Sequence, residues 1–195
     1  MQTQEPVQDK KTTDEKFHLS DILDLIELFV VALGVIMIVF TLLCRISFVQ
    51  GSSMETTLLE DDVLLISDLF YEPKVGDIVV IQAPGVDNGK AIVKRIIATE
   101  GQTVEIKADG VYVDGEKLSE TDGSLHYTVN FSPWEADQYK YTPMSLTVGE
   151  GELFVMGDHR SVSLDSRIFG TVDQRCVIGK VYFRILPFSQ VGSVK

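Results

Sequence analysis

The sequence predicts a mainly β fold with antiparallel sheets, preceded by one apolar helix that crosses a membrane. Three observations predict it. Short segments rich in β-branched and aromatic residues alternate with turn signals after residue 62. Two Asp-Gly pairs flank residues 111–113, a pattern typical of consecutive tight hairpins. A long uncharged apolar run precedes all of these segments.

The chain has room for one folded unit. Its 195 residues, 45% of them hydrophobic, suffice for a single core plus an anchor but hardly for two cores. We expect a polar, disordered cytoplasmic tail over residues 1–20. A transmembrane signal anchor over residues 21–47 and an extracytoplasmic β domain over residues 48–195 are expected to follow.

The anchor is predicted from the apolar run. Residues 28–44 contain no charge, and the apolar stretch 25–46 matches the roughly 20 residues that cross a bilayer. A buried core helix is the alternative, but a helix that is apolar on every face over five turns is rare in soluble domains. A cleaved signal peptide would have a shorter apolar core and a small-x-small pair after it, which this segment lacks.

Basic residues predict the orientation of the anchor. Lys10, Lys11 and Lys16 precede it, whereas Arg45 is the only basic residue for nearly thirty positions after it. Because basic flanks stay on the cytoplasmic side, we expect a single-pass protein of the cell membrane. Its amino terminus would be cytoplasmic and its β domain outside.

Charge and composition exclude several function classes. Residues 45–195 hold 14 basic against 22 acidic residues, so nucleic acid is not an expected partner. Cys44 and Cys176 are too far apart in the sequence to form a metal-binding pair. The three histidines are scattered, at His18, His126 and His159. We therefore expect no metal and no cofactor, and the oligomeric state is not predicted.

The β domain is expected to contain seven short strands. They are predicted at residues 63–66, 78–82, 92–98, 103–107, 111–113, 153–156 and 177–185. Between residues 119 and 148 the pattern gives way to an irregular segment with five aromatic residues. We expect this segment to be an excursion that packs beside the sheet.

A candidate nucleophile lies just past the anchor. The segment Gly51-Ser52-Ser53-Met54 joins the apolar run to the first strand. Gly51 permits close backbone approach, and Met54 can line an apolar pocket. A polar linker with two ordinary serines would look the same. A serine hydroxyl becomes a nucleophile only when a base lies within hydrogen-bond reach.

Lys94 is the candidate base. It lies in the apolar segment 91–98, which is expected to be a strand buried on both faces. Side chains alternate along a strand, so Lys94 and Arg95 point to opposite faces. An apolar setting lowers the pKa of a lysine, as a general base near neutral pH requires. A lysine reaching out from an edge strand is the alternative.

A third segment, residues 157–167, combines two acidic residues, two arginines and three serines directly after a predicted strand. We expect Asp158, Arg160, Asp165 and Arg167 to form arginine–carboxylate pairs that fix this loop as a structural support. A serine in it can orient the lysine amine. An ordinary charged turn is the alternative, because exposed ion pairs are often worth under about 1 kcal/mol.

Together these segments resemble bacterial type I signal peptidases, especially the compact single-span kind. The resemblance extends from the anchor to about Phe183. It rests on Ser53-Met54 followed by Thr57-Leu58 and Asp62, on residues 76–80, on Lys94-Arg95 and on residues 157–167. It implies coiled antiparallel β-sheets and a serine endopeptidase that removes signal peptides from exported preproteins. In that family Ser53 would be the nucleophile, Lys94 the general base, and Ser163 the hydroxyl that orients the lysine.

The resemblance also implies where substrate and oxyanion bind. Small side chains at the first and third positions before the cut would enter shallow pockets near Met54, Leu58 and Val93. Gly51 stands where some members carry a hydroxyl that contributes to the oxyanion hole. Backbone N–H groups at Gly51 and chiefly at Ser53 are therefore expected to form that hole. The sequence leaves open whether the Ser52 hydroxyl contributes.

Three positions depart from the pattern of the family. Thr56 replaces a usual proline, Asp61 a usual glycine and His159 a usual asparagine. None of these changes removes a reacting group. Other readings stay open: a Ser/His enzyme that uses His159 as base, and a non-catalytic preprotein-binding or surface-assembly factor of the same fold. A soluble self-cleaving repressor-type protease is disfavoured by the apolar span.

Overall fold

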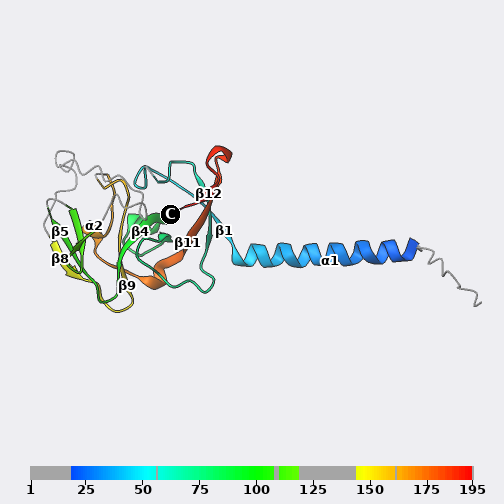
Figure 1. Cartoon of the computed structure of the whole chain (residues 1–195), viewed down its shortest axis with the longest axis horizontal. Helices are drawn as coiled ribbons and strands as arrows, with labels where there is room; N and C mark the ends of the chain where they lie inside the picture. Colours follow the sequence, from blue (N-terminus) through cyan, green and yellow to red (C-terminus); the bar gives the residue numbers. More distant parts are fainter. Residues whose placement is uncertain (1–18, 56, 108–109, 119–143, 161, 195) are drawn as a thin grey trace, which may run out of the picture. The chain divides into compact units, whose positions relative to one another are not determined.

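The computed structural model describes residues 19–55, 57–107, 110–118, 144–160 and 162–194. The chain divides into two compact units, residues 1–41 and 42–195. Helix α1 belongs mainly to the first, and the strands belong to the second (Figure 1).

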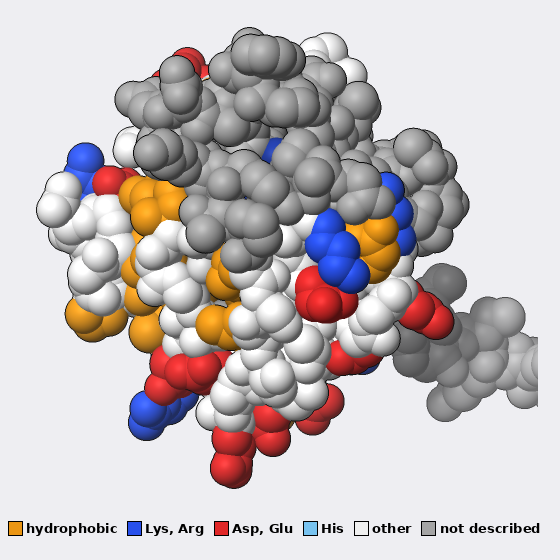
Figure 2. Space-filling view, turned by 90° about the vertical axis from the view of Figure 1, so that its left-hand side faces the viewer, with side chains coloured by type: hydrophobic (Ala, Val, Ile, Leu, Met, Phe, Trp, Pro, Cys, Tyr) orange, Lys and Arg blue, Asp and Glu red, His pale blue; other side chains and the backbone are white. Residues whose placement is uncertain are grey.

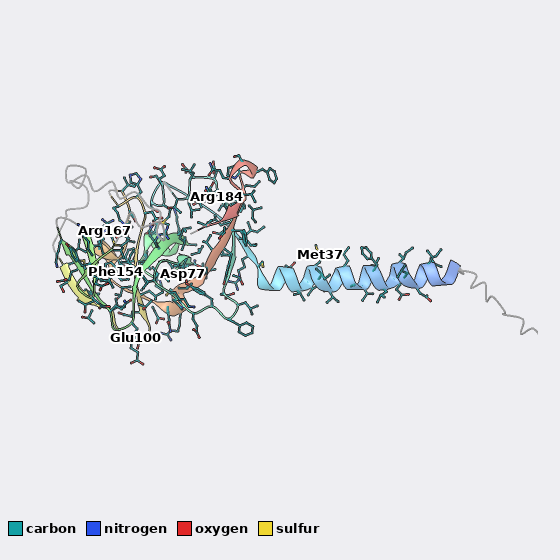
Figure 3. All side chains as sticks on the ribbon, viewed as in Figure 1. Met37, Asp77, Glu100, Phe154, Arg167 and Arg184 are labelled. Carbon is teal, nitrogen blue, oxygen red and sulfur yellow. The ribbon has the colours of Figure 1, made fainter. Side chains whose placement is uncertain are left out.

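Helix α1 spans Leu19–Leu43. Its segment Ile22–Val39 is long and apolar enough to cross a membrane, and none of it is buried inside the protein. Figure 3 shows side chains of this segment, Met37 among them, projecting from the helix. An apolar surface on every side is the property expected of a helix in lipid.

The structure corrects the expected end of the anchor. The prediction carried it to residue 47, but strand β1 already begins at Arg45 and runs to Phe48. The β1 backbone pairs with β2, Val63–Ser67, so that Arg45 faces Ile66 and Phe48 faces Val63. Ile46 and Phe48 continued the apolar composition of the helix, which hid this strand in the sequence.

An eight-stranded antiparallel sheet forms the larger part of the β unit (Figure 1). Its main path runs β1-β2-β11-β3-β4-β9-β10, and β12 pairs with β11. The further strands are β3 (Ile78–Ile81), β4 (Ile92–Thr99), β9 (Glu152–Met156), β10 (Val172–Asp173), β11 (Val177–Leu186) and β12 (Gly192–Ser193). Register shifts interrupt the pairing of β11 with β2 and β3 and the pairing of β4 with β9, and such irregularities curl a sheet.

A second sheet of four strands has the order β7-β6-β5-β8. Its strands are β5 (Thr103–Lys107), β6 (Gly110–Val113), β7 (Glu116–Lys117) and β8 (Met144–Thr147). Figure 2 views the molecule from the side on which Figure 1 labels β5 and β8. Hydrophobic side chains show there in several separate places, and acidic side chains gather along the lower edge.

Strand β8 is a second correction, because its residues were expected within the irregular segment 119–148. Met144 and Leu146 are partly buried against the core while Ser145 and Thr147 are exposed, the alternation of a half-buried strand. The strand has only four residues and follows a stretch rich in proline and aromatic residues. Its alternation of half-buried and exposed side chains is therefore too short to recognise in the sequence. Residues 119–143 lie outside the described part.

The predicted mainly β, antiparallel fold is confirmed. All seven expected strands are present within one or two residues of their predicted bounds, as β2 to β6, β9 and β11. The unpredicted strands, β1, β7, β8, β10 and β12, have four residues or fewer. Short helical segments occupy Asp87–Gly89, Ser166–Phe169 (α2), Gln174–Cys176 and Phe188–Gln190.

Strand β4 contributes to three hydrophobic clusters. Val93 belongs to a cluster with Met54 and Leu58, two residues of the loop between β1 and β2. Ile96 belongs to a second cluster, and Ile97 to a third beneath the four-stranded sheet. The strand is therefore buried on both faces, as its sequence predicted, and any charged side chain on it must find a partner inside the protein.

Candidate active site

The loop between β1 and β2 carries Ser53. Two backbone hydrogen bonds close its ends, from Val49 N to Asp62 O at 2.9 Å and from Asp61 N to Val49 O at 3.1 Å. Asp61 adopts a positive φ of 68°. Glycine is the usual residue for this conformation, and aspartate is among the few others that tolerate it. Thr56, the other departure in the loop, lies outside the described residues.

Asp62 and Arg184 tie this loop to the sheet. Arg184 Nη1 donates to Asp62 Oδ2 at 2.9 Å, and Arg184 Nη2 donates to the carbonyl oxygen of Thr57 at 3.2 Å. Asp62 also accepts the Leu59 N–H at 2.9 Å. Arg184 is a residue of β11, and Figure 3 labels it beside that strand. The loop is thus held at its far end by charge-assisted hydrogen bonds.

Lys94 meets Ser53 at the centre of the site. Its Nζ lies 2.6 Å from Ser53 Oγ and donates to the Val93 carbonyl at 3.1 Å. The lysine is only 3% exposed. Burial lowers the pKa of the Lys94 amine from its ordinary 10.5 to about 8, although the carboxylates of Asp165 and Asp158 oppose this shift. A buried lysine with a lowered pKa can accept the proton of a serine hydroxyl.

His159 faces the backbone of Ser53. Its backbone N–H donates to Ser53 O at 3.0 Å, and its Nδ1 lies 3.1 Å from Ser52 O. The same Nδ1 lies 3.3 Å from a carboxylate oxygen of Glu55. Among the described residues, only the Lys94 amine lies within hydrogen-bond distance of Ser53 Oγ. This geometry disfavours His159 as the base.

Gly157 packs directly against the carbonyl of Ser53. A methyl group added at Gly157 would overlap the Ser53 carbonyl oxygen and the Ser163 hydroxyl. The missing side chain therefore allows strand β9 and the loop after it to approach the Ser53 backbone. In the sequence this glycine stands out only as the first residue of the segment 157–167.

Arg95 holds Asp158 in a buried ion pair. Arg95 Nε and Nη2 donate to the two oxygens of Asp158 at 2.8 and 2.6 Å, and both side chains are fully buried. Arg95 Nη1 donates to Gly76 O at 2.8 Å, and Thr57 Oγ1 donates to Asp158 Oδ2 at 2.5 Å. Strand β4, the loop before β3, the loop of Ser53 and the end of β9 are thereby joined.

This pair corrects the expectation that Asp158 is held from within its own loop. Arg160 donates from Nε to Gly157 O at 2.9 Å instead. A buried arginine on β4 requires an acidic partner, so the sequence contained a reason to expect an ion pair at Arg95. The expected pairing within the loop does occur between Asp165 and Arg167, with Arg167 Nε 2.8 Å from Asp165 Oδ1.

Asp165 also fixes the backbone beside Ser53. Its Oδ2 accepts the Gly157 N–H at 3.0 Å. A buried carboxylate therefore orients the peptide unit of Gly157, the residue that packs against the Ser53 carbonyl. Arg167 Nη2 donates in addition to Arg160 O at 2.7 Å. The loop after β9 is therefore cross-linked by hydrogen bonds to side chains and to main chain.

Ser163 is buried beside Gly157, but no hydrogen bond to Lys94 is present. Within the described part of the chain, Ser163 Oγ has no hydrogen-bond partner. The lysine amine is held by Ser53 and by the Val93 carbonyl.

The three residues expected near the substrate pockets are buried together. Met54, Leu58 and Val93 are 1%, 0% and 9% exposed and share one core cluster, so they lie beneath the surface. Gly51 is exposed, two residues before Ser53, with φ at 76°.

A family model described as signal peptidase, peptidase S26, matches residues 22–186. The chain belongs to this family. It is a serine peptidase of the S26 family and removes signal peptides, as its motifs predicted.

Several relatives of this signal peptidase are named signal peptidase I. A probable signal peptidase I-1 of Synechocystis is 35% identical over 178 residues, which cover 87% of this chain and 85% of that protein. Signal peptidase IB of Staphylococcus aureus is 33% identical over 153 residues, or 73% of this chain and 78% of that protein. A crystal structure of signal peptidase I from Enterococcus faecalis is 32% identical and covers 56% of this chain and 97% of that chain, with a TM-score of 0.44.

Proposed function

We propose that Ser53 is the nucleophile and Lys94 the general base of this signal peptidase. The observation that carries the proposal is the 2.6 Å distance between Lys94 Nζ and Ser53 Oγ in a site where the lysine is buried. A general base must lie within about 2.6–3.2 Å of the proton that it removes and must have a pKa near the working pH. The lowered pKa of Lys94, about 8, supports the second requirement.

The reaction passes through an acyl-enzyme. Neutral Lys94 takes the proton of Ser53 Oγ as the oxygen attacks the scissile carbonyl. The tetrahedral intermediate breaks its C–N bond, and the Lys94 ammonium returns the proton to the leaving amine. Lys94 then takes a proton from water, whose oxygen attacks the carbonyl carbon of the acyl-enzyme ester. The bond from that carbon to Ser53 Oγ breaks, the Lys94 ammonium returns the proton to Ser53 Oγ, and the new carboxyl terminus leaves.

The oxyanion would be stabilised by backbone N–H groups, that of Ser53 first and that of Gly51 beside it. Asp158, Arg160, Asp165 and Arg167 support the loop that packs on Ser53 and take no part in the chemistry. We assign Ser163 as the hydroxyl that orients the Lys94 amine. Its burial next to Gly157 supports this role, although the bond itself is not formed in this structure.

The substrates are preproteins with small side chains at the first and third positions before the cut. The preprotein would lie extended beside a strand edge, with those side chains above Met54, Leu58 and Val93. Helix α1 would cross the membrane once, with the amino terminus cytoplasmic and the β unit outside. Confinement of enzyme and preprotein to one membrane raises their effective concentration.

Cleavage of a preprotein bearing Ala-x-Ala before its cleavage site tests the proposal. The detergent-solubilised protein should cut after the second alanine, and Ser53→Ala and Lys94→Ala should each abolish the cut. Lys90→Ala is the matched control, because Lys90 is an exposed lysine four residues away and should be dispensable.

Other results would favour the rival functions. Activity kept by Lys94→Ala and lost completely in His159→Ala would support a Ser/His enzyme. A folded protein that binds the preprotein but never cuts it would support a preprotein-binding or surface-assembly factor.

A further inference from the structure

His159 hydrogen-bonds to the backbone on both sides of the Ser53 α-carbon. Its Nδ1 lies 3.1 Å from Ser52 O, and its backbone N–H donates to Ser53 O at 3.0 Å. The first oxygen belongs to the peptide plane before the Ser53 α-carbon, and the second belongs to the plane after it. One residue from the loop after β9 therefore contacts both planes.

These two planes determine how Ser53 is presented. The peptide unit is rigid, so the orientations of the planes on either side of an α-carbon set its φ and ψ. Those angles in turn limit the directions that the Ser53 hydroxyl can take toward Lys94. The plane before the α-carbon also carries the Ser53 N–H, which points opposite to the Ser52 carbonyl in a trans peptide.

The groups around Nδ1 indicate where the imidazole proton lies. Ser52 O and the Glu55 carboxylate, at 3.1 and 3.3 Å, are both acceptors. A ring nitrogen that faces two acceptors can hydrogen-bond to them only as a donor, so we assign the hydrogen to Nδ1. Nδ1–H therefore donates to the Ser52 carbonyl. This carbonyl and the Ser53 N–H belong to one peptide unit, and hydrogen bonds at its two ends strengthen each other.

We propose that His159 is a positioning residue that aims the Ser53 N–H at the oxyanion and fixes the Ser53 backbone. The inference rests on the proposed function, in which Ser53 attacks the substrate and its N–H stabilises the oxyanion. His159 acts through the peptide bond and takes no proton from the substrate or from Ser53.

A second donor shares the Ser52 carbonyl, which limits the size of the effect. The Glu55 N–H donates to the same oxygen at 3.1 Å within the turn. Loss of the imidazole therefore loosens the peptide plane but does not free it. The expected loss of rate is smaller than the roughly hundredfold or greater loss that follows removal of an oxyanion donor itself.

Two variants at His159 separate positioning from other roles. In His159→Asn the amide Nδ2 stands as many bonds from the backbone as Nδ1 of histidine, so the donor is kept without a titrating ring. In His159→Leu the volume is kept and the donor is lost. Each variant is assayed in the full-length protein for kcat, for KM and for inhibition by a peptide aldehyde, which forms a tetrahedral adduct with the serine.

We expect His159→Leu to lower kcat by about tenfold to fiftyfold and to leave KM within about twofold. Its inhibition constant for the aldehyde should rise by the same factor as kcat falls, since both depend on the oxyanion. His159→Asn should stay within about threefold of the parent in all three measurements. If His159→Leu does not fold, His159→Ala provides the same comparison.

Three results would overturn the inference: full activity in both variants, loss of activity in His159→Asn, or a fall in kcat with unchanged aldehyde inhibition. The second would point to the imidazole as a base. Ser53→Ala is the separate control for the proposed function, since a parent-like rate in Ser53→Ala would refute the nucleophile itself.

Discussion

Arg95 and Asp158 form two parallel hydrogen bonds, 2.8 and 2.6 Å long, between side chains that are closed from water. Arg95→Met should lower the free energy of unfolding by about 3–5 kcal/mol, because it leaves the Asp158 carboxylate buried without its counter-charge. Denaturant unfolding of the full-length protein in detergent measures the change.

The chain offers a matched control for this prediction. Arg175 and Asp173 also form a bidentate pair, but the arginine is fully exposed. Arg175→Met should leave the denaturation midpoint unchanged. Equal effects of the two substitutions would mean that burial does not determine the importance of the Arg95 pair.

The pH dependence of kcat/KM should follow the Lys94 amine. The proposed base can accept a proton only when neutral, so the rate should rise with pH and level off above the Lys94 pKa of about 8. Below pH 8 the neutral fraction falls about tenfold per pH unit, and the rate should fall with it. Initial rates between pH 6 and 9.5 check this, with folding verified at each pH. A rate independent of pH over this range would contradict a lysine base.

The same burial makes Lys94 a cost to stability. Its pKa is lower in the folded protein than the ordinary 10.5, so the unfolded chain binds more protons between pH 8 and 10.5. In that window stability therefore rises with pH, and the full cost, at most roughly 3 kcal/mol, is present below about pH 8. Lys94→Met should be inactive but more stable than the parent at pH 7.

The stability gain of Lys94→Met should shrink as the pH approaches 10.5. Unfolding of parent and variant at pH 7 and 9.5 gives the two differences, and all other titrating groups cancel in the comparison. A gain that grows with pH would show that the folded state does not disfavour the ammonium.

Gly157→Ala should impair both activity and stability. The added methyl group would overlap Ser53 O and the Ser163 hydroxyl, so the Ser53 backbone must move away from β9. Overpacking of this kind costs about 1–3 kcal/mol, and we expect kcat to fall at least tenfold. Gly192→Ala is the control, because nothing lies within 4 Å of the added atom there. Similar behaviour of both variants would refute the close-packing argument.

Much of the sheet and the meeting of Ser53 with Lys94 could be predicted from the sequence. Strand β4 is an apolar run long enough to be recognised as a buried strand in the sequence. Its burial on both faces implied that the lysine on it is shielded from water. The motif around Ser53 identified the serine that this lysine would contact. These features depend on local composition and on short patterns, which a single sequence displays.

Other pairings between distant segments, beyond that of Ser53 with Lys94, could not be predicted. Asp158 has Arg160 two positions away, yet it pairs with Arg95, 63 positions earlier in the chain. Which arginine reaches a carboxylate depends on sheet register and burial, and the residue types alone do not reveal either. The bonds of His159 to the Ser53 backbone were hidden for the same reason, because a main-chain acceptor has no sequence signature.

The alternation of Lys94 and Arg95 along β4 has a consequence for how copies of the enzyme can fail. A slip of β4 by one residue that brings Arg95 to the position of Lys94 would put a guanidinium where the amine meets Ser53, and a guanidinium cannot lose its proton near neutral pH. The same slip would strand Asp158 without its counter-charge inside the protein. A molecule misregistered in this direction would thus be inactive and unstable at once. Misfolded molecules that persist with residual peptidase activity are therefore not expected. Activity is itself an indicator that β4 is paired in the correct register.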